Sequence, residues 1–507
     1  MSEHFPVLIV VSPLLVAFIT AALGWLAPRA TFWTALGGVG IAGVSAWGVL
    51  YRVATSGPLE YRLGGWAPPW GIVYEVDGLN ALVLVAVTSV AFLGLISGKK
   101  AIEHDYGDRL GAFYGLFLLS LTGLVGISVT GDAFNLYVLL EVASLTGYAL
   151  IGLGPGRAPL ASLNYVYLGT IGASFYLLGI GYLYTITGSL NMADIARLLP
   201  PLYGSRTLLA AFSIAMVGLW LKMALFPLHA WLPRAYSLAP SPAAVLLAPL
   251  VTKVMIYVMI RLMFNVFTPA YVWGEAGVSQ LVVWLAVAAI VAGAFMALAE
   301  RDFKRMLTYI IVAEVGYMVG GAWIGNRLAL TGAILHIIND AAMTLCVFLA
   351  AANLSFKLGG TGFPSLEGLF KKMPWTMGAL VVGAMSIIGV PPTCGFFSKW
   401  YLLRGAMAGG QYLFAAALIF SSLVCVVLFF RIFEIAYYEP LGHGHGEAGA
   451  AHGEGQPHDA GAVAVAEAPA LMVLPLWVAA ASLVALGLLT ARLVGGFIDP
   501  AIPAVIH

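Results

Sequence analysis

The chain has 507 residues, of which 61% are hydrophobic and only 9% are charged. Soluble globular domains carry roughly 25% charged residues, so the composition excludes a set of soluble domains and indicates a protein that crosses a membrane many times. The formal net charge of +1 offers no concentrated basic surface, which argues against a nucleic-acid partner. Cys346, Cys394 and Cys425 lie inside apolar runs without CxxC spacing, which favours small packing residues over a disulfide framework or a metal site.

The apolar runs predict an all-α polytopic membrane protein with about fourteen transmembrane helices, since a span needs about 20 mostly apolar residues. The expected helices lie near residues 5–26, 30–50, 77–98, 111–130, 132–153, 160–186, 207–235, 242–264, 277–299, 306–325, 327–354, 374–405, 411–438 and 466–497. The first run is too long for a signal peptide and no small-residue cleavage site follows it, so we expect it to remain as a helix. Three runs exceed the usual length, and each of them is expected to tilt or break; they are 207–235, 327–354 and 374–405.

Two stretches are predicted to leave the membrane. Residues 51–76 carry Gly, Pro and aromatic residues, which is typical of an ordered loop. Residues 439–465 are low-complexity and rich in Gly, Ala and His, which predicts a flexible solvated loop. Irregular spacing and the lack of cysteine argue against a metal site in this loop, with loose divalent-metal binding as the alternative; its histidines are His443, His445, His452 and His458.

The distribution of Lys and Arg predicts how the chain is oriented in the membrane. With the N-terminus outside, thirteen of these residues fall on the cytoplasmic side and seven on the opposite side. The cytoplasmic set is Arg29, Lys99, Lys100, Arg109, Arg157, Arg234, Arg301, Lys304, Arg305, Lys357, Lys371, Lys372 and Arg431. The opposite set is Arg52, Arg62, Arg197, Arg206, Arg261, Arg327 and Arg404. Because cytoplasmic loops carry the excess of positive charge, both termini are expected on the outer side.

A few ionisable residues fall inside the predicted spans, where a charge costs at least about 2.5 kcal/mol, so each is a candidate functional residue. They are Glu141, Lys222, Lys253, Glu314, His336, Asp340 and Lys399. At about 1.5 Å per residue, Glu141 and His336 lie roughly 14 Å deep and Lys253 about 16 Å deep. This shared depth favours a functional line of charges over scattered structural ion pairs.

Prolines follow Lys222 in KMALFPLHAWLPRAYSLAPSP and precede Lys399 in GVPPTCGFFSK. Proline breaks a helix, and broken backbone at membrane depth is tolerated where it lines protein or a wet cavity. Two such lysines in different halves of the chain predict an ion transporter built from two inverted five-helix repeats, with helices 7 and 12 broken. The predicted division is 1–110 as N-terminal flanking helices, 111–264 and 277–438 as the repeats, 439–465 as the loop and 466–507 as the C-terminal helix.

Each candidate also has a purely structural interpretation. Lys222 and Lys399 are candidates for structural salt bridges, and Lys253 for a snorkelling role shared with Arg261. Glu141 is a candidate for capping an internal hydrogen-bond network. The remaining alternatives are a packing histidine for His336, a hydrogen-bond partner of that histidine for Asp340, a packing role for Glu314, and gating rather than proton transfer for His229, which follows Lys222 in the break.

These residue types suit proton transfer. A lysine buried in a low dielectric prefers to be neutral, and a nearby carboxylate restores its charge. Moving a carboxylate toward or away from a buried lysine therefore switches that lysine between holding and releasing a proton. Lysines joined by histidines and trapped water would form a horizontal relay, and no cofactor or metal is expected because GxxxxGK[ST], a Rossmann GxGxxG and paired haem histidines are absent from the sequence.

Four stretches carry a resemblance to a known family: TGDAFNLYVLLEVASLTGYALIG, KMALFPLHAWLPRAYSLAPSPAAVLLAPLVTKVMIYVMIR, RMLTYIIVAEVGYMVGG and GVPPTCGFFSKWYL. Over roughly residues 75–440 the chain resembles the antiporter-like subunit family. That family supplies proton-pumping membrane subunits of respiratory complex I, of membrane-bound hydrogenases and of multisubunit Mrp-type sodium/proton antiporters. The KxxxFPLHxWLPxAxxxAPxPxxxxL pattern is long and specific to it.

The resemblance implies roles for individual residues. Glu141 matches the family's glutamate of helix 5, Lys222 and Lys399 match the lysines of broken helices 7 and 12, Lys253 the helix 8 lysine, and His336 the first histidine of helix 11. One departure concerns helix 11. Many members read HxxxHxxxK there, whereas this chain has His336, Asp340 and Thr344, so the link between Lys253 and Lys399 is expected to run through Asp340 or water.

The resemblance further implies a subunit of a larger complex in the cell membrane of a prokaryote. Its partners would be other membrane subunits, the lipid bilayer, protons and, in an antiporter, sodium. The D-type Mrp subunit fits best in length and in its sequence motifs, and a middle subunit of complex I or of a membrane hydrogenase is the alternative. The short tail after the last predicted span disfavours the largest complex I subunit and the A-type Mrp subunit. A standalone small-solute carrier and a membrane redox enzyme remain as competing classes, and the second lacks cofactor ligands.

Overall fold

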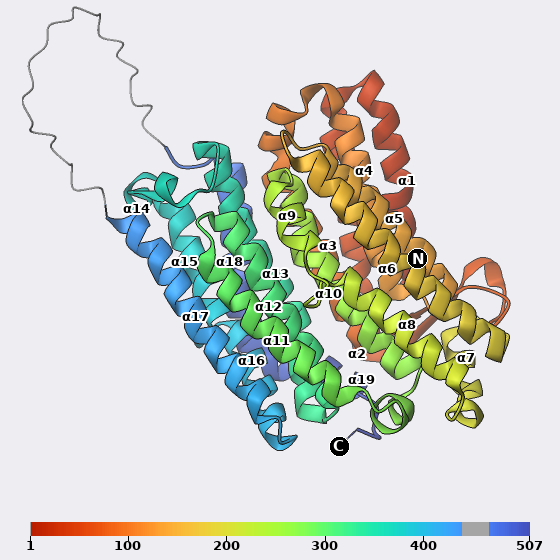
Figure 1. The fold of residues 1–507 in the computed structure, drawn as a ribbon. Helices are drawn as coiled ribbons and strands as arrows, with labels where there is room; N and C mark the ends of the chain where they lie inside the picture. Colours follow the sequence, from red (N-terminus) through yellow and green to blue (C-terminus); the bar gives the residue numbers. More distant parts are fainter. Residues whose placement is uncertain (1, 439–465, 507) are drawn as a thin grey trace, which may run out of the picture.

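The computed structural model describes residues 2–438 and 466–506. The predicted loop at 439–465, with His443, His445, His452 and His458, lies outside these residues, so the interpretation of that loop stays a prediction. Within the described residues, twelve helices are long and apolar enough to cross a membrane. The prediction of an all-α polytopic membrane protein is therefore confirmed (Figure 1).

The first half of the chain forms α1 to α10 and a hairpin of two short strands. The helices are α1 Phe5–Leu26, α2 Thr31–Ser56, α3 Gly78–Asp105, α4 Leu110–Val129, α5 Ala133–Gly152, α6 Ala158–Thr187, α7 Met192–Leu198, α8 Arg206–Lys222, α9 Trp231–Leu238 and α10 Ser241–Asn265. The antiparallel strands are β1 Leu59–Arg62 and β2 Val73–Val76. Residues 51–76 thus form an ordered segment, as expected, except that α2 continues to Ser56 before the loop begins.

The second half of the chain forms α11 to α19. The helices are α11 Ser279–Ala299, α12 Phe303–Ile324, α13 Arg327–Leu358, α14 Leu369–Lys372, α15 Pro374–Ile388, α16 Cys394–Ala408, α17 Tyr412–Tyr437, α18 Ala470–Leu493 and α19 Asp499–Ala501. Gly325, Gly359 and Gly389 follow α12, α13 and α15 in the left-handed conformation, which glycine adopts without a Cβ penalty.

Two of the three overlong runs break and one does not. The run 207–235 divides into α8 and α9, separated by residues 223–230 around Pro227, and 374–405 divides into α15 and α16 around Pro391 and Pro392. Each break contains proline, which removes a backbone hydrogen bond. The third run forms the continuous helix α13, whose sequence contains no proline.

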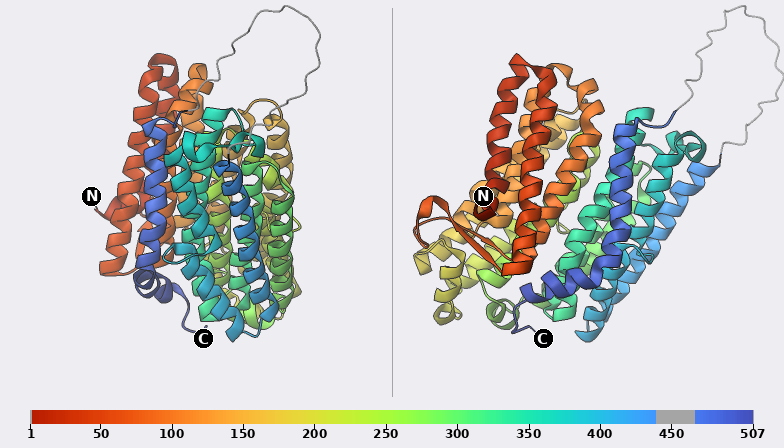
Figure 2. Two further views of the ribbon diagram at one scale, coloured as in Figure 1. Left: turned by 90° about the vertical axis from the view of Figure 1, so that its left-hand side faces the viewer. Right: turned by 180° about the vertical axis from the view of Figure 1, so that it is seen from behind.

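Helices α3, α10 and α13 occupy the centre of the bundle. They contact one another, while α1 and α2 pack on the α3–α4 side and α11 and α17 lie on the far side of α12 (Figure 1). The C-terminal helix α18 returns to contact α3, α13, α15 and α16, and Figure 2 shows it in dark blue between the two halves of the molecule. Both halves of the chain are thereby joined along α3.

Two matching backbone connections occur at opposite ends of α3. Ala133 N–H donates to Leu190 O and Met192 N–H to Gly131 O, each at 2.9 Å. In the second half, Phe303 N–H donates to Thr361 O at 2.8 Å and Phe363 N–H to Arg301 O at 3.0 Å. In each case an aspartate, Asp132 or Asp302, caps the helix that follows.

The position of each connection is set by its contacts with α3. The first lies near the start of α3, because Gly131 N–H donates to Val73 O and Asn80 Nδ2 donates to Ser128 O. The second lies near the end of α3, because Asp302 and Thr361 line one cavity together with Asp105. The same local structure thus occurs twice, once at each end of a helix about 42 Å long.

The outer surface of the bundle is apolar. Leu15, Phe18, Trp25, Leu145 and Phe430 are each more than half exposed. Large hydrophobic residues on this scale remain exposed where lipid rather than water is the solvent. Most of the candidate charges described below are buried inside the bundle, whereas Glu141 and His229 are partly exposed.

Candidate functional site

Lys222 lies in the first of three polar clusters inside the bundle. It is the last residue of α8, directly before the break, and its side chain is 3% exposed. Its Nζ lies 4.0 Å from Glu141 Oε1 on α5 and donates hydrogen bonds to Ser144 Oγ at 2.7 Å and Tyr148 OH at 3.4 Å. The carboxylate of Glu141 is therefore near the ammonium but not in direct hydrogen-bond contact with it.

Lys253 and Asp340 form the second cluster, where α10 meets α13. Lys253 Nζ lies 3.0 Å from Asp340 Oδ2, and the two side chains are 2% and 0% exposed. Thr344, one turn after Asp340, donates to Asp340 Oδ1 at 2.8 Å and accepts from Lys253 at 3.2 Å. The three residues form a closed triangle in which the carboxylate of Asp340 directly contacts the lysine.

His336 is fully buried one turn before Asp340 on the same face of α13. Its Nδ1 is hydrogen-bonded to Ser398 Oγ at 2.8 Å, and its ring lies 5.5 Å from that of Tyr317. Its Nε2 has no partner among the described residues. One nitrogen is thus fixed by a hydroxyl, while the other is buried without a hydrogen-bond partner among the described residues.

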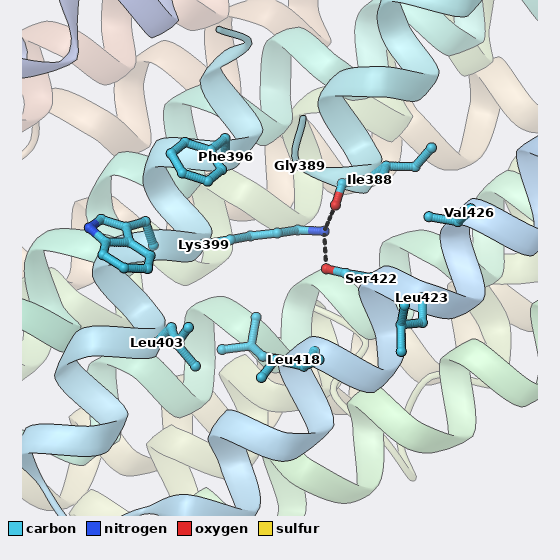
Figure 3. A pocket seen from close by; sticks show the side chains of 11 residues that line it. Ile388, Gly389, Phe396, Lys399, Leu403, Leu418, Ser422, Leu423 and Val426 are labelled. Atoms are coloured by element: carbon cyan, nitrogen blue, oxygen red, sulfur yellow. Dashed lines mark hydrogen bonds between the residues drawn. The ribbon is translucent and has the colours of Figure 1, made fainter. Parts of the chain in front are cut away.

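Lys399, on α16, forms the third cluster without a carboxylate at ion-pair distance among the described residues. Its Nζ donates to Ile387 O at 2.6 Å. It also donates to Ile388 O at 3.4 Å and to Ser422 Oγ at 3.1 Å (Figure 3). The two carbonyls are free because α15 ends at Ile388, so the helix break itself supplies the acceptors. The ammonium also lies 5.2 Å from the ring centre of Tyr317.

The Lys399 side chain crosses a cavity of about 290 Å³ between α16 and α17. Figure 3 shows the ammonium pointing between Ile388 and Ser422, with Phe396 and Leu418 on either side of its stem. Most of the lining is hydrocarbon, so an amine in this cavity has only the three acceptors named above to stabilise its charge.

Glu314 and His229 occupy less well defined positions. Glu314 on α12 is 2% exposed and lies against Asp340, and its Oε1 has no hydrogen-bond partner among the described residues. His229 lies in the break between α8 and α9, where its ring stacks on Phe226 at 5.1 Å and lines a cavity of about 480 Å³. His229 is thus placed where water can reach the break below Lys222.

The Lys253–Asp340 cluster is linked more closely to the Lys399 cluster than to the Lys222 cluster. α13 carries both Asp340 and His336, and Tyr317 lies beside both His336 and Lys399. Between Lys222 and Lys253, no hydrogen bond or ion pair links the two lysines within the described part of the chain. A proton that passes between them therefore requires water or side-chain movement.

Several hydroxyl groups at these sites were not predicted from the sequence. Ser144 and Tyr148 lie three and seven residues after Glu141, on the same helical face, so helical spacing alone contained that signal. Ser398, Ser422 and Tyr317 come from separate helices and had no comparable local signal. Each of these hydroxyls can both donate and accept a hydrogen bond, which suits a partner of a group that changes protonation.

Two basic residues differ from their predicted surroundings. Arg261, considered for a snorkelling role, instead forms a bidentate pair with Asp77 at 2.6 and 2.9 Å. Lys304, predicted in a cytoplasmic loop, is 7% exposed and donates to Ala239 O at 2.6 Å, because α12 begins at Phe303 rather than near residue 306. Both residues therefore make structural contacts between helices.

Buried charges beside broken helices, inside a polytopic helical bundle, define an ion-translocating membrane protein of the antiporter-like class. Residues 130–425 match the family described as NADH:quinone oxidoreductase/Mrp antiporter, transmembrane, and the chain belongs to that family. It is a multi-pass membrane protein for which the plasma membrane is the implied location.

Named relatives cover most of the chain. It is 41% identical over 505 residues to the N-type subunit of the NADH-quinone oxidoreductase of Desulforudis audaxviator, covering 99% of both proteins. It is 32% identical over 439 residues to the D-type subunit of the Na+/H+ antiporter of Alkalihalophilus pseudofirmus, covering 86% of this chain and 88% of the relative.

Solved structures place the same fold in larger assemblies. A chain of the membrane-bound sulfane sulfur reductase, an archaeal respiratory membrane complex, superposes with a TM-score of 0.88 at 27% identity, over 98% of this chain and 96% of that one. A chain of the Mrp complex from Dietzia sp. shares the fold with a TM-score of 0.85 at 23% identity, over 99% and 98%. Both of these chains come from membrane-protein assemblies, which their descriptions name as an archaeal respiratory membrane complex and an Mrp complex.

Proposed function

We propose that the chain is the proton-translocating, D-type subunit of a multisubunit cation/proton antiporter of the Mrp class. The observation that carries this proposal is the Lys222 site, where a buried ammonium faces a carboxylate at 4.0 Å without a hydrogen bond between them. At an effective dielectric of about 20, two unit charges at that distance interact by about 4 kcal/mol. A small movement of Glu141 then decides whether Lys222 holds or releases its proton.

The proposed relay runs from the Glu141–Lys222 pair to Lys253 and Asp340, then through His336 to Lys399. Ser144 and Tyr148 accept hydrogen bonds from the protonated lysine and can donate to the neutral one, so Lys222 has partners in both states. Asp340 takes the place of the family's second histidine as the partner of Lys253. His229 and Glu314 are proposed as accessory groups, with His229 on the water-accessible side of Lys222.

We also propose that residues 111–264 and 277–438 are two inverted repeats, with 1–110 and 466–507 as flanks. The matching connections at Gly131–Met192 and Arg301–Phe363 support this division, because they recur at opposite ends of α3. An odd number of membrane crossings between the two connections would place them on opposite sides of the membrane, as inverted repeats require. Both termini are proposed on the outer side, according to the distribution of Lys and Arg.

The proposal is tested by Lys222→Ala and Lys222→Arg in the assembled complex. Both variants are expected to abolish sodium-driven pH-gradient formation in everted membrane vesicles while the complex still assembles. Arginine keeps a positive charge beside Glu141 but does not release a proton at physiological pH, so it separates proton transfer from a structural ion pair. Full activity of Lys222→Arg would reject the relay.

Three further variants accompany this experiment, and two of them are controls. Lys100→Ala removes an exposed lysine from the end of α3 and should leave transport unchanged. Glu141→Gln should act like Lys222→Ala, because it removes the carboxylate that controls the lysine. Deletion of residues 441–462 should have no effect, and loss of transport on that deletion would overturn the prediction of a passive loop.

A redox-driven proton pump is the second candidate, since the 41% identical relative carries the name of a NADH-quinone oxidoreductase subunit. The same relay would operate in that complex, with redox chemistry elsewhere as the driving force. The proteins that co-purify with this chain separate the two candidates. Small hydrophobic membrane subunits alone indicate the antiporter, whereas iron–sulfur or nickel–iron subunits indicate the redox pump.

A further inference from the structure

Three arginines from separate elements line one lateral cavity at the end of the molecule where α6 begins. Arg157 directly precedes α6, Arg234 lies on α9, and Arg305 lies in the first turn of α12. The cavity has a volume of about 360 Å³, and its lining contains no acidic side chain among the described residues. Asn164 and Ser237 add neutral polar groups between the arginines.

The positive charge of this cavity is largely uncompensated. Arg305 pairs with Glu300 at 3.2 Å, but Glu300 does not line the cavity. Arg157 and Arg234 have no ion pair or hydrogen bond within the part of the chain that the structure describes. All three arginines are exposed and line one space, so their charges repel one another and an anion in that space would offset the repulsion. Their planar donors match a phosphate group in particular.

A second cavity, of about 480 Å³, continues from the first. Arg234, Arg305 and Asn164 line both cavities, and the second extends to His229 in the break between α8 and α9. The three-arginine cavity therefore lies beside the break that follows Lys222. It contains no residue of the proposed relay, and the accessory His229 lines only the adjoining second cavity.

An exposed apolar track on α6 leads away from the arginines toward the middle of the bundle. Leu160, Leu163, Tyr167 and Ile171 are 59%, 45%, 63% and 45% exposed and follow one another at intervals of three or four residues. That spacing places them on one side of the helix. A soluble anion would make no apolar contact with this surface, whereas an acyl chain attached to a bound phosphate would lie along it.

We propose that the three-arginine cavity binds the phosphate of an anionic phospholipid, whose acyl chain lies along the exposed face of α6. The lipid comes from the leaflet at the α6 N-terminal end, which is the cytoplasmic leaflet in the proposed orientation. Basic pockets between transmembrane helices on that side are suited to anionic headgroups. The lipid headgroup supplies the negative charge that the lining residues lack.

The test uses the detergent-purified assembled complex and counts bound phospholipids by native mass spectrometry while phosphatidylglycerol or phosphatidylcholine is added. The wild-type complex should bind phosphatidylglycerol in preference to phosphatidylcholine. In Arg157→Gln/Arg234→Gln, the affinity of that site should fall about fivefold for each arginine removed. The double Arg→Lys variant keeps both charges but loses the planar donors, so it should bind phosphatidylglycerol more tightly than the double Gln variant and less tightly than the wild-type.

Arg301→Gln is the matched control, because it removes an exposed arginine close to the start of α12 that lines neither cavity. It should leave phosphatidylglycerol binding unchanged. Equal phosphatidylglycerol binding by the wild-type and the double Gln variant would overturn the proposal. Inorganic phosphate that displaces the bound phosphatidylglycerol as well as added phosphatidylglycerol does would also overturn it, because the site would then bind a soluble anion. A crosslinker placed at position 157 or 234 that reacts with an acidic segment of a partner protein would also reject the proposal that a lipid occupies the cavity. The single Gln variants carry the test if the double variant does not assemble.

Discussion

Asp340 holds two partners at once, since it faces Lys253 at 3.0 Å and accepts a hydrogen bond from Thr344 at 2.8 Å. Because all three side chains are buried, the pair is stable only while both charges are present. Removal of one partner leaves an uncompensated charge in the interior. A structural role and a proton-transfer role for Asp340 therefore both predict damage from a single substitution, and only a double substitution separates them.

We predict that Asp340→Asn lowers the free energy of unfolding by about 3–5 kcal/mol, the usual effect of breaking a buried pair. Lys253→Met combined with Asp340→Asn should recover most of that stability, because no charge is left unpaired. Transport should stay absent in the double variant if the pair carries protons. Thermal unfolding of the purified complex and vesicle transport measure the two effects, and transport by the double variant would contradict the relay through this pair.

The sequence was informative about single residues where helical spacing or a motif constrained them. It predicted Glu141, Lys222, Lys253, His336, Asp340 and Lys399 as buried candidates, and the structure buries all except Glu141, which is partly exposed. It did not predict that Lys399 would be held by carbonyls of the broken helix, because those acceptors come from the backbone and not from a residue type. The roles of all six residues remain predictions that the proposed variants address.

At the level of secondary structure elements, one ion pair connects the start of α3 with the end of α10. Asp77 caps α3 by accepting from the amides of Leu79 and Asn80, and both oxygens also receive the Arg261 guanidinium. Burial acts to raise the pKa of Asp77, but Arg261 and the two amides outweigh it, so its pKa lies below the usual value. The carboxylate consequently stays ionised throughout the physiological pH range.

We predict that Asp77→Asn lowers the free energy of unfolding by about 1–3 kcal/mol, because asparagine keeps the helix cap and loses only the charged pair. Since the folded pKa is depressed, the stabilisation is present above the unfolded pKa of about 3.9 and is lost as pH falls through the folded value. The cost of the substitution should therefore be equal at pH 6 and pH 9. Asp194→Asn, which removes a pair with the largely exposed Arg197, is the control and should cost less than about 1 kcal/mol.

Helix breaks were predictable from the sequence, and helix lengths were less so. Proline marks both breaks, at Pro227 and at Pro391–Pro392, because its ring removes a backbone donor. α2 and α3 run beyond the predicted limits, to Ser56 and Asp105, since a helix continues into water where no proline or glycine stops it. The strands β1 and β2 were missed because four-residue strands leave too little alternation to recognise.

For the whole molecule, the matching connections at the two ends of α3 support the proposal that two inverted repeats place equivalent loops on opposite sides of the membrane. The sequence predicted this inversion from two lysines beside broken helices. The backbone connections that support it join residues about 60 positions apart, which no local pattern reveals. The orientation itself depends on the count of Lys and Arg alone and needs a direct measurement.

We predict that a cysteine at Ser56 is labelled by a membrane-impermeant maleimide in intact cells, whereas a cysteine at Asp108 is labelled only after permeabilisation. Both positions are exposed, the first at the end of α2 and the second just after α3. Cys346, Cys394 and Cys425 are buried, so they should contribute little background. The reverse labelling pattern would place both termini inside the cell and would move the three-arginine cavity to the outer leaflet.

The contact of α18 with α3 has a consequence for biosynthesis. The ribosome synthesises α3 long before α18, so one side of α3 lacks its native neighbour until α18 has been made. A product that stops before Ala470 would present that surface to lipid or to insertion chaperones. A chain that lacks α18 therefore leaves α3 incompletely packed.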